Sequence, residues 1–158
     1  MKNRFKLRMR FYSTNPDSPV FFEIKRRMNS IILKQRGGVR RSAVDWILNG
    51  SFPELEHLVA KKNPSQLMAL QHFSELTAKL QAKPKVHIAY LREAYVSEDD
   101  NYRLTMDRDV VAEPNLTSHL TTEVKEPRKS FTPHVILELK FTNRFPDWFG
   151  DLVRTFNI

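Results

Sequence analysis

Phe5-Lys6-Leu7-Arg8-Met9-Arg10-Phe11 alternates apolar and cationic side chains. Successive side chains of a β-strand point to opposite faces, so this run predicts a strand with Lys6, Arg8 and Arg10 on one face. The alternation of charged and apolar residues returns in three later runs, Phe22-Glu23-Ile24-Lys25, Tyr102-Arg103-Leu104-Thr105-Met106-Asp107 and Leu137-Glu138-Leu139-Lys140-Phe141. A single strand of this kind is typical of a solvated face. Four of them favour a shared cavity that binds a polyanion.

Strands and turns dominate the first third of the chain. The alternating pattern predicts strands over residues 4–12 and 20–27, and the polar cluster at 13–19 predicts the turn of an antiparallel hairpin. A third, short strand is expected over 31–34. We interpret Gly37-Gly38, which follows it, as a simple turn.

Helical spacing replaces the alternation over about 42–82. Ser42 is suited to cap a short helix over 43–48, with Asp45 as a weaker partner, and Pro53 is suited to open a second helix. The longest helix is expected to begin at Asn63-Pro64, because apolar residues recur at 67, 70, 73, 76 and 80. Trp46 lies on an apolar helical face and is expected in the core.

The alternation then returns for the rest of the chain. Strands are expected over 85–96, 102–111 and 134–142, with a polar loop containing some strand over 113–133. A final amphipathic helix is expected over 146–156, with Trp148 facing the sheet. The order of strands, helices, strands and helix predicts an α+β fold with an antiparallel sheet.

Composition and charge indicate which class of partner and which cellular compartment suit this chain. The 158 residues suit one domain over 1–158, and the net charge of +8 favours a polyanion such as nucleotide, polyphosphate, nucleic acid or a membrane surface. The absence of Cys excludes a disulfide framework and a thiolate metal site. No apolar run approaches the ~20 residues of a membrane span, and Arg8 and Arg10 interrupt any signal-peptide core. A cytoplasmic location is the default expectation.

The familiar catalytic motifs are missing from the sequence. There is no P-loop, GxGxxG, GxSxG or HExxH, and the five His residues lack metal-ligand spacing. Arg8 and Arg10 stand about 7 Å apart along one strand face, which suits successive phosphates of an extended chain. The alternative for this single strand is a solvated edge face.

Two later charged residues stand among apolar neighbours. Arg92 shares strand parity with Val86, Ile88 and Tyr90, and a cation on such a face requires a partner. Glu138 lies among aliphatic residues, with Lys140 on the same face. A carboxylate among phosphate-binding cations repels phosphate unless it holds a divalent metal or anchors a cation. Mg²⁺ or Mn²⁺ is suited to the metal role. The alternative is a plain Glu/Lys pair.

The ordered set of these segments resembles the VTC domain, the catalytic domain of vacuolar transporter chaperone polyphosphate polymerases. That family belongs to the triphosphate tunnel metalloenzymes, or CYTH-like fold. The matching segments are 6–12, 22–25, 34–36, 89–95, 103–108, 135–141 and 146–149. The resemblance implies an antiparallel β tunnel or barrel with a helical insertion and a C-terminal helix. It also implies transfer of the ATP γ-phosphoryl group onto a polyphosphate chain.

The resemblance implies a role for each charged residue in the matching segments. Glu138 would bind Mn²⁺ or Mg²⁺, Glu23 would orient Lys25, and Asp107 would support the site. Catalysis would involve Arg8, Arg10, Arg92, Arg103 and Lys140. Phosphate binding would involve Lys6, Arg8, Arg10, Lys25, Lys34, Arg36, Arg92, Arg103 and Lys140. Such a site acts by positioning and electrostatic stabilisation.

The chain differs from the family at both ends, where it begins at the family's second strand and stops before a later lysine-containing segment. We therefore expect a truncated tunnel whose open sheet edges favour self-association. Two other functions remain open, a polyphosphate- or nucleotide-binding module without turnover and a hydrolase of tripolyphosphate or nucleoside triphosphates. Nucleic acid is disfavoured, because Glu23 and Glu138 lie on the same faces as the cations.

Overall fold

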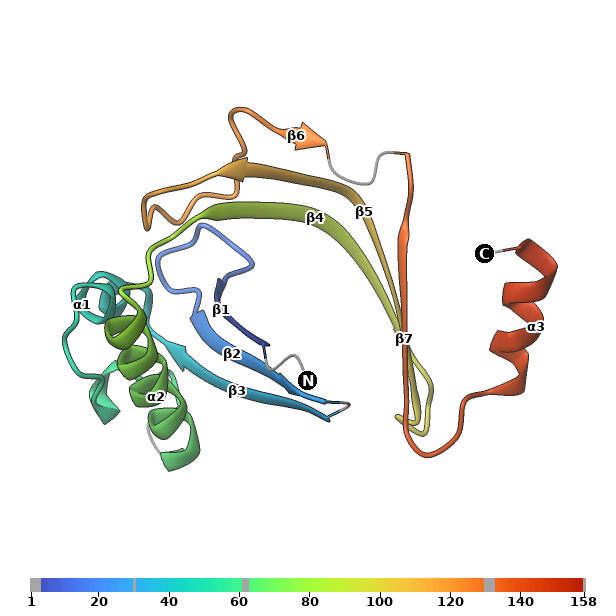
Figure 1. Ribbon diagram of the computed structural model, residues 1–158, viewed down its shortest axis with the longest axis horizontal. Coiled ribbons are helices and arrows are strands. Elements are labelled where there is room, and N and C mark those ends of the chain that lie inside the picture. Colours follow the sequence, from blue (N-terminus) through green and yellow to red (C-terminus); the bar gives the residue numbers. More distant parts are fainter. Residues whose placement is uncertain (1–3, 30, 61–62, 130–132, 158) are drawn as a thin grey trace. The chain divides into compact units, whose positions relative to one another are not determined.

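The computed structural model describes residues 4–29, 31–60, 63–129 and 133–157, and it divides the chain into two compact units (Figure 1). The first unit comprises Met1–Lys85 and Asn115–Glu123, and the second comprises Val86–Pro114 and Val124–Ile158. Each contains one antiparallel sheet, and each sheet is open rather than closed on itself among the described strands. The α+β class, the helical insertion and the C-terminal helix are confirmed.

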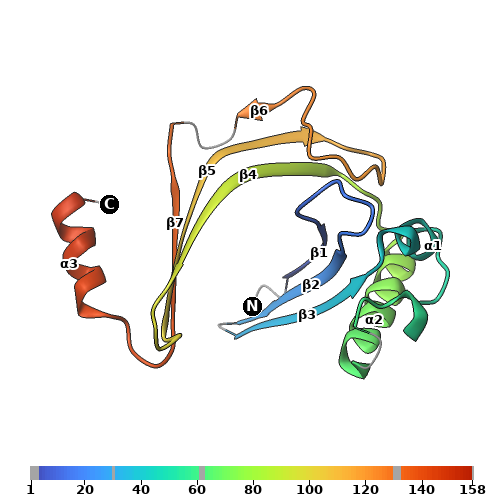
Figure 2. The same ribbon diagram turned by 180° about the vertical axis from the view of Figure 1, so that it is seen from behind.

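The sheet of the first unit is a three-stranded meander. It consists of β1 (Arg4–Arg10), β2 (Val20–Met28) and β3 (Ile31–Val39), in the order β1-β2-β3 (Figure 2). The turn between β1 and β2 is stabilised by the Asn15 side chain, whose Oδ1 accepts a hydrogen bond from the Asp17 N–H at 2.9 Å. The hairpin predicted from the alternation is therefore present.

The two glycines of β3 correct one prediction. Gly37 and Gly38 lie inside the strand, which continues to Val39, so the expected simple turn is wrong. The long helix packs against this part of β3. A Cβ on Gly37 would lie 2.7 Å from the Gln66 carbonyl oxygen and would also overlap Leu70. The missing side chain of Gly37 permits this close approach of helix and strand.

The helical insertion follows β3 in four pieces. They are the 3₁₀ turns η1 (Arg41–Ala43) and η2 (Leu55–His57) and the helices α1 (Val44–Leu48) and α2 (Pro64–Leu80). The start of α2 is as predicted, because the Asn63 side chain accepts from the Gln66 N–H. Ser42 does not cap α1, since η1 leads directly into it, and the helix expected after Pro53 is only a single turn.

The core of the first unit lies between its sheet and the insertion. Phe22 and Ile24 of β2 are buried with Leu70 and Phe73 of α2, and the Phe22 and Phe73 rings meet edge to face with centroids 4.9 Å apart. Trp46 is 52% exposed, so its expected place in the core is wrong. Val44 and Ile47 of α1 supply the buried side chains instead.

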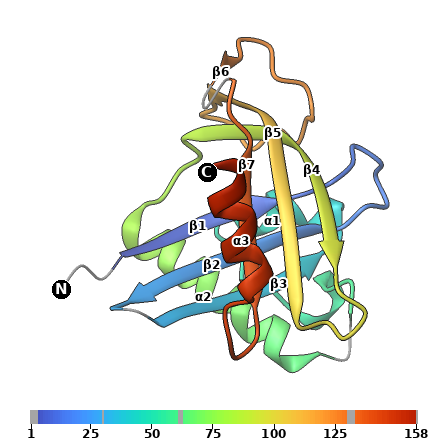
Figure 3. The same ribbon diagram turned by 90° about the vertical axis from the view of Figure 1, so that its right-hand side faces the viewer.

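The second unit is built around the long strand β5 (Tyr102–Pro114). It pairs with β4 (Val86–Val96) on one side and with β6 (Arg128–Lys129) and β7 (Ile136–Phe141) on the other (Figure 3). The loop predicted before β7 thus contains one short strand. The β4–β5 register shifts between Ala89 and Leu91, near the positive φ of 52° at Asp109.

The final helix α3 (Asp147–Phe156) belongs to the second unit. Phe149 is buried, whereas Trp148 is about half exposed and touches Tyr102 edge to face. The predicted helix is therefore present, but Trp148 is not a core residue. Among the described residues, no helix is long and apolar enough to cross a membrane.

Candidate functional site

The register of β1, β2 and β3 gathers the early charged residues on one face, which we name the first charged face. Directly paired residues of an antiparallel sheet share a face. Arg8 pairs with Glu23, which pairs with Arg36 on its other side. Two rows on the same face flank the Arg8 row. One consists of Lys6, Lys25 and Lys34, and the other contains Arg10. All these residues were site predictions, and the opposite face holds the apolar core.

Glu23 is the centre of this face. Its residue exposure is 0%, yet it ion-pairs with three cations. Arg8 Nε lies 2.9 Å from Oε2, Lys34 Nζ lies 3.1 Å from Oε1, and Arg36 Nε lies 3.6 Å from Oε1. Burial raises the pKa of Glu23, but the hydrogen bonds from Lys34 and Arg8 outweigh it and lower the pKa below its usual value. The carboxylate is therefore ionised at neutral pH.

This arrangement corrects the expected role of Glu23. No ion pair among the described residues joins it to Lys25, which is exposed. Glu23 instead fixes cations of the two neighbouring strands. Arg36 is held further by Phe21, because its guanidinium carbon lies 3.6 Å from the ring centroid. One carboxylate thus orders several cations but cannot neutralise them all, and the face keeps an excess of positive charge.

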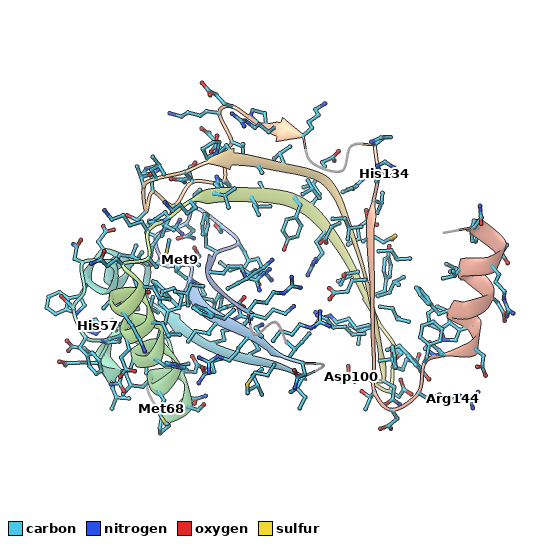
Figure 4. The ribbon with its side chains drawn as sticks, in the orientation of Figure 1. Met9, His57, Met68, Asp100, His134 and Arg144 are labelled. Atoms are coloured by element: carbon cyan, nitrogen blue, oxygen red, sulfur yellow. The ribbon has the colours of Figure 1, made fainter. Side chains whose placement is uncertain are left out.

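The later predicted residues gather on one face of the second unit, the second charged face. The register pairs Arg92 with Asp107, Thr105 with Glu138, and Arg103 with Lys140. Because these pairs alternate along the strands, the five predicted residues among them share a face with Thr105. Asp100 lies at the β4–β5 turn and Arg144 in the segment between β7 and α3 (Figure 4).

Arg92 has the partner that its apolar neighbours required. Its Nε and Nη2 each lie 2.6 Å from an oxygen of Asp107, which makes a two-point contact. The hydrogen bonds with Asp107 raise the pKa of Arg92 above its usual value, although burial acts in the opposite direction. The guanidinium also lies 5.2 Å from the Tyr90 ring centroid. Asp107 therefore orients Arg92.

Glu138 and Thr105 supply oxygen atoms on the second charged face. The Glu138 carboxylate is partly exposed and lies 3.7 Å from Lys140 Nζ. Thr105 is only 4% exposed, and its Oγ1 has no hydrogen-bond partner among the described residues. An unpaired buried hydroxyl costs free energy, so a ligand that engages it would remove that cost. Sequence reasoning missed Thr105, because only the β5–β7 register places it opposite Glu138.

The oxygen donors of Glu138 and Thr105 suit a metal ion that is bound partly by its substrate. The described residues contain no group of three or more His, Cys, Asp or Glu that could enclose an ion. Mg²⁺, however, is commonly bound through one or two carboxylates together with substrate phosphates and water. One carboxylate beside a hydroxyl is compatible with that mode and not with an all-protein cage.

Comparison with known families gives one match. The family model of the VTC domain matches residues 1–158. The chain belongs to the VTC domain family. No curated protein and no solved structure gave a significant match. Membership relates this VTC domain to polyphosphate polymerases in general.

The predicted site residues of this VTC domain fall into two groups. Those before the helical insertion share the first charged face, and those after it share the second. Each face combines exposed cations with a carboxylate that orders a guanidinium, Glu23 in one case and Asp107 in the other.

Proposed function

We propose that this VTC domain is a metal-dependent phosphotransferase that moves the terminal phosphoryl group of ATP onto a polyphosphate chain. The observation that carries the proposal is the buried Glu23 carboxylate, held by Arg8, Lys34 and Arg36 on a face otherwise rich in cations. A carboxylate in that position keeps the cations in place before the ligand arrives.

Phosphoryl transfer needs positioning and charge stabilisation more than covalent chemistry. Arg8 and Arg36 present planar donors suited to two-point contact with phosphate, and Lys25 and Lys34 add point charges. Because Glu23 and Asp107 already hold the guanidinium groups, little reorganisation is required as charge develops. The side chains of both charged faces would therefore bind and orient phosphoryl groups.

The metal would be held by Glu138, with Thr105 as a neighbouring oxygen donor. A bound Mn²⁺ or Mg²⁺ supplies Lewis-acid stabilisation of phosphoryl oxygens. Lys140 is the present partner of Glu138, at 3.7 Å. When Glu138 is engaged elsewhere, the Lys140 ammonium is free to contact an anionic ligand.

The direct test is incubation of the purified chain with ATP and Mn²⁺, followed by gel staining for polyphosphate. The proposal expects long polymer from the wild type and a loss of about 100-fold in rate for Arg36→Ala, the size typical of removing one stabilising group. Arg144→Ala is the matched control, since that exposed cation pairs only with the exposed Asp147 among the described residues. Absence of polymer from a folded wild-type chain contradicts the proposal.

A second candidate is a module that binds polyphosphate without turnover. The small donor set around Glu138 favours it, because the described residues contain no group of three or more His, Cys, Asp or Glu that could hold a metal ion. Salt-sensitive tripolyphosphate binding without product would support this module. Release of orthophosphate from tripolyphosphate or ATP would instead identify a hydrolase.

A further inference from the structure

Tyr12 lies just beyond the end of β1, where the first charged face ends. The guanidinium groups of Arg10 and Arg36, which come from different strands, lie close enough to its phenol to lower the pKa of that group. The residue is 67% exposed, and its ring contacts Phe21 edge to face with centroids 6.1 Å apart. Since guanidinium groups only donate, the phenol oxygen can act towards them only as an acceptor, and its own O–H can donate to a ligand.

The groups around Tyr12 are held in place before any ligand binds. The Arg36 guanidinium carbon lies over the Phe21 ring, 3.6 Å from its centroid, and Arg36 Nε lies 3.6 Å from Glu23 Oε1. Arg10 pairs with Phe21 in the β1–β2 register, and Gly38 pairs with Phe21 on the other side. The Phe21 ring therefore contacts both the Tyr12 ring and the Arg36 guanidinium group.

We propose that Tyr12, Arg10 and Arg36 form a binding subsite for the terminal phosphoryl group of a linear phosphate chain. A terminal phosphoryl group has three peripheral oxygens, whereas an internal one has two. Three converging donor groups match the terminal group better. This inference rests on the proposed function, and it adds a residue and a direction to it.

The layout of the first charged face gives that direction. Beyond the Arg8 row, the cations continue through Lys6, Lys25 and Lys34 toward the β2–β3 turn. At the Tyr12 end, the last row holds uncharged Phe21 and Gly38 beside Arg10. Among the paired rows of this sheet, a chain whose terminus lies at Tyr12 thus meets its further cations in the direction of the Arg8 row.

The electrostatics of the phenol agree with this geometry. Burial raises the pKa of Tyr12, but hydrogen bonding and charge from Arg10, followed by Arg36, lower it below the usual value of 10.0. A polarised phenol donates a stronger hydrogen bond to an anion. A bound phosphoryl group offsets the two guanidinium charges, so it should raise the pKa of Tyr12 again.

The first test compares Tyr12→Phe with the wild type by calorimetry, using linear tripolyphosphate and cyclic trimetaphosphate, which has no terminal phosphoryl group. We expect the variant to bind the linear anion about tenfold more weakly, with less than a threefold change for the ring. Tyr95→Phe is the matched control, because the half-exposed Tyr95 phenol donates to Glu93 in the second unit. Equal losses for both anions, or none, overturn the subsite.

The second test follows phenol ionisation by ultraviolet absorbance. The chain has four Tyr residues, and subtracting the Tyr12→Phe titration isolates Tyr12. We expect ionisation below pH 10 without ligand and an upward shift with saturating tripolyphosphate. No shift overturns the inference even if polymer is formed, whereas polymer failure with a shifted Tyr12 overturns only the proposed function. A wild type that binds neither anion overturns the subsite.

Discussion

At the scale of single residues, Glu23 explains how a strongly basic face stays ordered. Glu23→Gln would leave Arg8, Lys34 and Arg36 without their shared carboxylate. Breaking a fully buried ion pair costs about 3–5 kcal/mol, and the partial exposure of these cations reduces the expected loss to about 2 kcal/mol. Urea unfolding at pH 7 measures it. The exposed Glu75 on α2 provides the control Glu75→Gln, which should change the free energy of unfolding by less than about 0.5 kcal/mol.

The same residue predicts a pH dependence with a definite sign. Because folding lowers the pKa of Glu23, its stabilisation is present above its usual value of 4.5 and is lost as pH falls through the lower folded value. The difference in unfolding free energy between wild type and Glu23→Gln should therefore shrink below about pH 4.5. Denaturant titrations from pH 7 to pH 3 test this. A difference that stays constant with pH would show that Glu23 is not the group responsible.

Thr105 leads to a prediction on metal binding that needs no turnover. Its Oγ1 lies in the row of Glu138 and has no hydrogen-bond partner among the described residues. We expect Thr105→Val to weaken Mn²⁺ binding about tenfold and Thr105→Ser to preserve it, as followed by Mn²⁺ electron paramagnetic resonance. Glu138→Gln should abolish binding. Equal affinities of the Val and Ser variants would mean that the hydroxyl plays no part.

Sequence alone predicted the charged residues of both faces but not how they are paired. Strand parity is a local property, so Arg8, Arg10 and Glu138 could be placed on faces without the fold. Pairing depends on register, which turns and bulges set. The partners of Glu23, the position of Thr105 opposite Glu138 and the convergence at Tyr12 therefore became visible only in the structure.

At the scale of elements, the contact between α2 and β3 depends on Gly37. In Gly37→Ala the new Cβ would meet the backbone oxygen of Gln66 at 2.7 Å, and a helix backbone cannot move aside as a side chain can. We expect a loss of about 2–3 kcal/mol in urea unfolding. Gly150→Ala in α3 is the opposite case, because its Cβ comes no closer than 3.8 Å to Phe145 and alanine favours helix. If both changes are equally tolerated, the tight contact is not present in solution.

The elements also show where local signals suffice. Asn63-Pro64 predicted the start of α2 correctly, because a cap and a first-turn proline act within one turn of helix. The turn predicted at Gly37-Gly38 was wrong, because the residues that approach this part of β3 come from α2, almost thirty positions later. The core position predicted for Trp46 was wrong for a related reason. Its helix is too short to bury more than the Val44 and Ile47 side.

At the scale of the whole molecule, a net charge of +8 attracts any polyanion, and the distribution of charge must provide the selectivity. A nucleic-acid surface gains from cations that reach phosphates along a groove. Here Glu23 and Asp107 hold Arg8 and Arg92 within their sheets. Charge fixed at short spacing suits a flexible phosphate chain, which can fold onto the donors, better than a stiff duplex.

Competition between polyphosphate and duplex DNA tests this view directly. With a fluorescent polyphosphate bound, we expect unlabelled polyphosphate to displace it at least tenfold more effectively than duplex DNA of equal phosphate concentration at 0.15 M salt. Raising the salt should weaken both, and the preference should persist because the ordered guanidinium contacts are short-range. Arg36→Ala should lose the preference and Arg144→Ala should retain it. Equal displacement by DNA in the wild type would mean that net charge alone governs what this domain binds.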